Sequence, residues 1–200
     1  MRQPGTKSMN ANNYKAATTK IFYGVLCIAI LSIIGGFISA IAVASALAGG
    51  SSWFIYLVPI LTVLGYVYYF LGLGDLYKEF EGDTAASIKR IRTAAILNIV
   101  ASLCSLIPIA GGIIAGILNL IAFIMCLLAY GKLRNDTNFP GRDGMKTLYT
   151  TAILQIIAAV LCIIPLINII GAIIAIIAFI MFIVGWAKVK NAPVESAPAE

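Results

Sequence analysis

The sequence predicts an all-α, polytopic membrane protein with six transmembrane helices arranged as three tandem hairpins. Hydrophobic residues make up 61% of the 200 residues, charged residues make up only 11%, and the mean hydropathy is +0.99. Soluble domains are typically about 45–50% apolar and about 25% charged. The composition therefore excludes an ordinary soluble domain.

The uncharged stretches give the number of spans. A transmembrane helix needs about 20 predominantly apolar residues. Asp, Glu, Lys and Arg are absent from three longer stretches: 54 residues at Ile21–Gly74, 39 at Thr93–Gly131 and 41 at Thr147–Ala187. Turn-forming residues divide them at Gly49–Ser52, Pro108–Gly112 and Pro165. The expected spans are residues 21–48, 53–74, 90–107, 112–131, 147–164 and 167–187.

The same division defines the segments of the chain. Residues 1–20 are an N-terminal segment, and residues 188–200, rich in Ala, Pro and Glu, are expected to be a disordered tail. Hairpin 1 occupies residues 21–74, a loop plus hairpin 2 occupies residues 75–131, and a loop plus hairpin 3 occupies residues 132–187.

The first span has an alternative interpretation as a secretory signal, because Ala46-Leu47-Ala48 follows a basic N-terminal segment. The apolar region of a signal peptide is about 7–15 residues long. Here it runs from Ile21 to Ala48, which favours a retained span. Cleavage after Ala48 would leave five spans and an N-terminus outside the cytoplasm.

Charged residues all fall on one face of this arrangement. The 14 basic and 8 acidic residues lie at the termini, between spans 2 and 3, or between spans 4 and 5, and the three opposite turns carry no charge. Cytoplasmic loops of membrane proteins carry the excess of Lys and Arg. Both termini and both long loops are therefore expected in the cytoplasm.

Hairpins 2 and 3 are similar in sequence. Shifted by 57 residues, Gly74–Pro108 aligns without a gap with Gly131–Pro165, with 11 identities in 35 positions. The pentapeptide Ile-Ala-Phe-Ile-Met occurs at residues 121–125 and again at 177–181. We interpret the two hairpins as a tandem duplication and hairpin 1 as a more diverged copy. A duplicated two-span unit keeps its orientation, so the copies are parallel repeats.

Small and aromatic residues have two interpretations each. Small residues let helices approach closely in a membrane, and they recur at Ser32, Gly36, Ala40, Ala44 and Ala48, at Gly112 and Gly116, and at Gly171 and Ala175. We favour packing inside the bundle over a face for a second copy. Aromatic residues near the span ends are expected to be interface anchors, with an aromatic ligand cage as the alternative; they are Tyr66, Tyr68, Tyr69, Tyr130 and Trp186 at one end and Trp53, Phe54 and Tyr56 at the other.

Charged residues would mark a proton relay or ion path inside a membrane, but the three uncharged stretches contain no Asp, Glu, Lys or Arg and the chain has no His. The side-chain amides of the spans are Asn98, Asn119, Gln155 and Asn168. Asn98 and Gln155 occupy equivalent positions of hairpins 2 and 3. Hydrogen bonding between helices is the favoured role of these amides, and a polar substrate site is the alternative.

No pattern in the sequence indicates catalysis, a metal or a cofactor. The four Cys residues lie in apolar runs without ligand-like spacing, where Cys packs as a small hydrophobe. In the loop between spans 2 and 3, Asp83 or Thr84 is expected to cap a short helix. This helix would present Lys89, Arg90 and Arg92 to anionic lipid headgroups.

Three tandem two-helix units with basic loops, together with the segment LLAYGKLRNDTNF at Leu127–Phe139, give the chain a resemblance to small six-span prokaryotic membrane proteins. These include proteins similar to the acid-resistance membrane protein family, which is built from a short repeated hairpin. The resemblance implies a similar architecture and a role in acid stress, and it transfers no functional residue.

The sequence thus predicts a non-enzymatic, multi-pass protein of a prokaryotic inner membrane. It is expected to act through helix packing, the lipid bilayer, a second copy or a membrane partner protein, and no nucleic-acid partner is expected. The alternative is a channel or carrier for a small neutral or apolar solute, lined by Asn98, Gln155 and Asn119.

Overall fold

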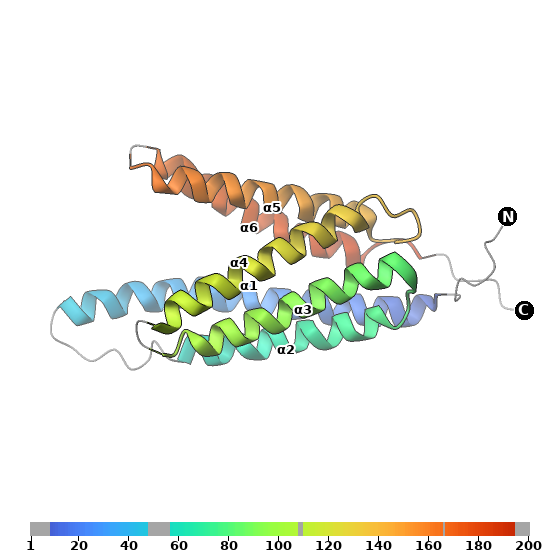
Figure 1. Cartoon of the computed structure of the whole chain (residues 1–200), viewed down its shortest axis with the longest axis horizontal. Coiled ribbons are helices and arrows are strands. Elements are labelled where there is room, and N and C mark those ends of the chain that lie inside the picture. Colours follow the sequence, from blue (N-terminus) through green and yellow to red (C-terminus); the bar gives the residue numbers. More distant parts are fainter. Residues whose placement is uncertain (1–8, 48–56, 108–109, 166, 195–200) are drawn as a thin grey trace, which may run out of the picture.

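A computed structural model describes residues 9–47, 57–107, 110–165 and 167–194. These residues form six helices and no strand (Figure 1). The helices are α1 (Ala11–Leu47), α2 (Leu57–Tyr77), α3 (Gly82–Cys104), α4 (Ala110–Leu133), α5 (Arg142–Ile163) and α6 (Asn168–Lys190). The all-α prediction is therefore confirmed.

Five of the helices have the length and composition needed to cross a membrane. They are α1 over Ala11–Ile38, α2 over Pro59–Tyr77, and α4, α5 and α6 over their whole lengths. The chain is therefore a helical membrane protein by these criteria. Helix α3 is not among the five: its first half contains Lys89, Arg90 and Arg92, so the crossing of α3 remains a prediction.

Several helices extend beyond the predicted spans on the charged side. Helix α1 begins at Ala11 rather than near residue 21, α3 begins at Gly82 rather than near residue 90, and α6 continues through Lys190. Apolar length locates the hydrocarbon region, whereas a helix can continue into the polar interface. The expected tail is ordered at its start, because Ala192 and Val194 pack against the core. Residues 195–200, and the turn at residues 48–56, lie outside the described residues.

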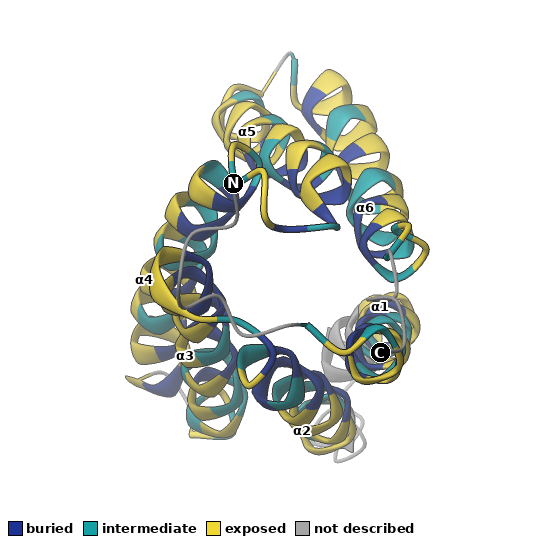
Figure 2. Ribbon diagram, turned by 90° about the vertical axis from the view of Figure 1, so that its right-hand side faces the viewer, coloured by how far each residue is buried: buried dark blue, intermediate teal, exposed yellow. Residues whose placement is uncertain are grey.

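The six helices form a closed ring (Figure 2). Each helix contacts the helices before and after it, and α1 contacts α6. The most extensive contacts join α1 to α2, α3 to α4 and α5 to α6, and the least extensive join α4 to α5 and α1 to α6. In Figure 1, α5 and α6 diverge from the other four helices toward the end without charged loops.

The second helix of each pair buries the same register positions. These positions are spaced by 57 residues between α2 and α4, the shift that aligns Gly74 with Gly131, and by 56 between α4 and α6, the spacing of the two pentapeptides. They are Gly65, Ala122 and Ala178; Gly72, Ala129 and Gly185; Leu73, Tyr130 and Trp186; and Leu76, Leu133 and Val189. The second helices of the three pairs therefore share four equivalent buried positions.

Small residues lie between closely packed helices at only some of the predicted positions. Gly171 is buried, and a Cβ there would lie 2.8 Å from Cys162 Sγ. Gly36, Gly112 and Gly116 are exposed, and a Cβ on each would meet nothing within 4 Å. The prediction that these three glycines pack inside the bundle is therefore wrong. The glycines at close crossings are instead Gly24, Gly65 and Gly72 between α1 and α2, and Gly144 and Gly185 between α5 and α6.

Aromatic side chains fill the end of the helix bundle that carries the charged loops. The Tyr14 ring centroid lies 6.3 Å from those of Phe80 and Phe139, which lie 5.5 Å from each other. The Tyr14 hydroxyl donates a hydrogen bond of 3.0 Å to the carbonyl of Val189, so the first helix is bonded to the last.

A second aromatic group lies deeper in the bundle. Trp186 makes edge contacts with Tyr69 and Tyr130, at centroid distances of 5.5 and 6.4 Å, and all three side chains are buried. The prediction that these three residues anchor the bundle at the lipid interface is therefore wrong. Tyr68 remains exposed, as an interface anchor would be.

Candidate functional site

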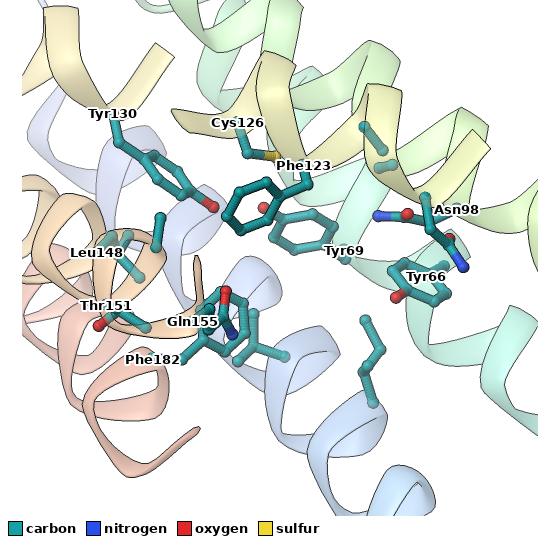
Figure 3. A pocket seen from close by; sticks show the side chains of 16 residues that line it. Tyr66, Tyr69, Asn98, Phe123, Cys126, Tyr130, Leu148, Thr151, Gln155 and Phe182 are labelled. Carbon is teal, nitrogen blue, oxygen red and sulfur yellow. The ribbon is translucent and has the colours of Figure 1, made fainter. Parts of the chain in front are cut away.

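A cavity of about 340 Å³ lies between the helices (Figure 3). Its 16 lining residues come from all six helices. Cavities that bind small molecules are typically about 300–1,000 Å³ and mostly apolar with a few polar groups. This cavity is therefore large enough for a small ligand.

Helical periodicity explains why these residues share the cavity. On α4, Asn119, Phe123, Cys126 and Tyr130 all line it. They follow one another at steps of four, three and four residues, which places them on one helix face. On α5, Leu148, Thr151, Ala152 and Gln155 line the cavity at positions i, i+3, i+4 and i+7, which also share one helix face. The cavity is thus the meeting point of continuous helix faces.

Three of the four amides from the sequence prediction come together here. Asn98, Asn119 and Gln155 line the cavity from α3, α4 and α5, and Figure 3 shows Asn98 and Gln155 on different walls. Helices α3 and α5 are not neighbours in the ring, so these two amides lie across it. Asn168 is exposed at the start of α6 and is not part of this site.

The amide groups do not bond the helices together. Within the described part of the chain, the side chains of Asn98, Asn119 and Gln155 have no protein hydrogen-bond partner. Asn98 is half-buried, and Asn119 and Gln155 are exposed. The favoured prediction of hydrogen bonds between helices is therefore wrong. The amides instead present donors and acceptors to the space between the helices.

Aromatic residues form the other part of the cavity wall. Tyr66, Tyr69, Phe123, Tyr130 and Phe182 line it, and the Tyr130 side chain interacts with Tyr69 and Cys126. The sequence pattern predicted the tyrosines at the membrane interface, and it indicated Phe123 only as part of a repeated pentapeptide. Phe123 follows Asn119 by four residues and so lies on the same helix face. An aromatic residue at that spacing from an amide was the sequence signal that could have identified Phe123 as a cavity residue.

None of the described residues that line the cavity is Asp, Glu, Lys, Arg or His. The described residues also hold no group of three His, Cys, Asp or Glu that could bind a metal ion. Charged groups are strongly disfavoured in such surroundings without a partner. The arrangement is therefore suited to a neutral ligand with at least one hydrogen-bonding group.

The residues predicted to contact lipid headgroups are separated by the structure. Lys89 and Arg90 are exposed on α3, whereas Arg92 is half-buried with its guanidinium carbon 4.3 Å from the centroid of Phe70. Lys89 and Arg90 remain predictions as headgroup contacts, and the Arg92 cation packs on an aromatic ring.

The predicted helix cap at the start of α3 is wrong. Glu81 precedes the helix without a side-chain capping bond. Thr84 instead donates a hydrogen bond to Asp136. This bond connects α3 with the segment between α4 and α5, a tertiary contact that the local sequence does not encode.

No protein-family model, no curated protein and no solved structure matches the chain. The resemblance to acid-resistance membrane proteins therefore stays a prediction.

Proposed function

We propose that the chain is a non-enzymatic, six-span protein of a prokaryotic inner membrane that binds a small neutral molecule in its central cavity and acts as a carrier or channel for it. Both termini are cytoplasmic in this proposal. The observation that carries it is the convergence of Asn98, Asn119 and Gln155 on one cavity, where their side chains have no hydrogen-bond partner among the described residues.

The energetics of an amide in a membrane support this assignment. An amide moved from water into apolar surroundings without a compensating hydrogen bond costs roughly 2–7 kcal/mol. Hydrogen bonds to a ligand offset that cost. A hydroxyl, carbonyl or amide of the ligand can bond to Asn98 or Gln155, while its apolar part contacts Tyr66 and Phe123.

The second candidate is a protein that acts only through lipid or partner contacts. The exposed glycines Gly36, Gly112 and Gly116 favour it, because exposed small residues let another helix approach closely. A transport measurement distinguishes the two candidates.

The test is uptake of radiolabelled butyramide, a small neutral amide with an apolar tail, into proteoliposomes. We expect uptake above that of protein-free vesicles. The double variant Asn98→Leu/Gln155→Leu should reduce it by about tenfold, since each hydrogen bond contributes about 0.5–1.5 kcal/mol.

Asn168→Leu is the matched control, because its amide lies outside the cavity. This variant should leave uptake unchanged. Uptake that survives in a folded Asn98→Leu/Gln155→Leu protein would contradict a carrier or channel and favour the second candidate.

The proposed topology is tested by cysteine accessibility in a background without native cysteines. Ser51→Cys and Ser105→Cys should react with an impermeant maleimide from outside intact cells, and Asn138→Cys should not. Ser105 follows α3 and is exposed, so its labelling tests whether α3 crosses the membrane. External labelling of Asn138→Cys would reverse the orientation.

A further inference from the structure

The exposed glycines of α4 continue the cavity face of that helix. Gly112, Gly116, Asn119 and Phe123 are spaced by four, three and four residues, so they lie on one side of α4. Asn119 and Phe123 line the cavity, and Gly112 and Gly116 have open space where a side chain would be. The cavity face of α4 therefore runs, without bulky side chains, toward the uncharged turns.

Helix α1 has the same arrangement. Val25 and Ile28 line the cavity, and Ser32 and Gly36 follow at steps of four residues on the same side. The Ser32 hydroxyl is bonded to the carbonyl of Ile28, and Gly36 has open space beside it. Two helices from opposite parts of the ring thus leave the region beyond the cavity unfilled.

The helix bundle is least closely packed beside this region. Helices α5 and α6 diverge from the other four toward the uncharged turns (Figure 1), and the contacts of α4 with α5 and of α1 with α6 are the two least extensive in the bundle. Asn119 on α4 and Gln155 on α5 are both exposed cavity residues. At the charged end, by contrast, Tyr14, Phe80 and Phe139 close the bundle.

From this geometry we propose that the cavity is reached sideways from the lipid bilayer, between α4 and α5 in the half of the membrane next to the uncharged turns. Its ligand is a neutral amphipathic molecule dissolved in the bilayer. This inference rests on the proposed binding function and adds the route and the class of the ligand. The apolar body lies between the diverging helices, and the hydrogen-bonding head reaches the amides.

The chemistry of the walls selects this class. A charged headgroup would meet no opposite charge in the lining, and a charge without a partner in such surroundings is strongly disfavoured. A fully apolar molecule would leave the donors and acceptors of Asn98, Asn119 and Gln155 unsatisfied. A molecule with one neutral polar end satisfies both requirements.

Cys126 lines the cavity and provides a reporter for the route. In the full chain with Cys27, Cys104 and Cys162 changed to Ala, we would compare two thiol reagents in proteoliposomes at the same alkaline pH, because the thiolate is the form that reacts. One is an uncharged N-alkyl maleimide that partitions into the bilayer, and the other is a sulfonated maleimide present on both sides. We expect Cys126 to react with the first reagent at least about tenfold faster, a difference of about 1.4 kcal/mol in barrier. A chain that retains only Cys27, which is exposed on α1, calibrates the lipid-borne reagent.

The variant Gly116→Phe should fill the route without touching the cavity. It is expected to slow N-alkyl labelling of Cys126 about tenfold, again about 1.4 kcal/mol. Ile117→Phe is the matched control at the same depth, because Ile117 is exposed on the other side of α4. It should leave the rate unchanged.

Three results would overturn the lateral route: comparable labelling by the sulfonated reagent, no labelling by either reagent, or a Gly116→Phe rate equal to that of the parent. None of these depends on butyramide uptake. A protein can therefore fail the transport test while the lateral route stands, or pass it while the route fails.

Discussion

The two ends of the helix bundle differ in how they are filled. At the charged end, aromatic rings, glycine crossings and the Lys20–Asp75 ion pair hold the helices together. At the uncharged end, Gly36, Gly112 and Gly116 have no neighbour within 4 Å of an added Cβ, although Gly171 packs against Cys162 within the α5–α6 pair. The same residue type thus performs two tasks. Glycine allows close approach where helices cross, and it leaves space where they diverge. The difference indicates a closely packed charged end and open space beside α1 and α4 at the uncharged end.

Among the substitutions that test this difference between the two ends, the largest effect on stability is expected at Gly144. A Cβ there would lie 2.5 Å from Val189 Cγ2 and 2.6 Å from the carbonyl oxygen of Gly185. Gly144→Ala should lower the free energy of unfolding by about 1–3 kcal/mol, the usual cost of overpacking. Unfolding of the purified protein in detergent measures it.

Gly112→Ala is the control at the open end, where a Cβ meets nothing. It should be neutral or stabilise by about 0.5–1 kcal/mol, since Ala is the better helix former. Equal destabilisation by the two substitutions would show that the ends are packed alike.

A smaller effect is expected from the bond that joins the first and last helices. Tyr14→Phe keeps the buried ring and removes the donor to the Val189 carbonyl. A typical hydrogen bond contributes about 0.5–1.5 kcal/mol, so the loss of unfolding free energy should be about 1 kcal/mol. Tyr23→Phe, at an exposed ring on the same helix, should change nothing measurable. If Tyr14→Phe lowered the free energy of unfolding no more than Tyr23→Phe, the packing of Tyr14 against Phe80 and Phe139 would not depend on this hydrogen bond.

The smallest effect is expected at the ion pair between α1 and α2. Lys20 Nζ lies 2.7 Å from Asp75 Oδ2, and both side chains are more than a third exposed. Lys20→Met should cost less than about 1 kcal/mol, as exposed pairs usually do, and the cost should shrink as salt is added. A salt-independent loss would place this pair in a less exposed environment.

The helices could be predicted from the sequence because hydrophobicity and span length act locally. The uncharged runs ending near Gly74 and Gly131, and the break at Pro165, correspond to the ends of helices or to a turn. Asn98 and Gln155 could also be selected from the sequence, since few polar residues interrupt the spans.

The surroundings of those residues could not be predicted, because they depend on the angles between helices. Tyr69 and Tyr130 have the sequence pattern of interface anchors, yet the ring turns them inward against Trp186. Gly116 has the pattern of a packing glycine, yet the divergence of α5 leaves it open. The sequence pattern indicates which face of a helix carries small or aromatic residues. It does not indicate which residues of the other helices lie opposite that face.

The contact between α1 and α6 bears on how the chain is synthesised. Tyr14 and Val189 are separated by 175 positions, so their bond forms only after nearly the whole chain has left the ribosome. Until then the bundle lacks the contact between α1 and α6 that closes it into a ring. The contact between α1 and α6 therefore forms after the α1–α2 and α3–α4 pairs have had time to pack.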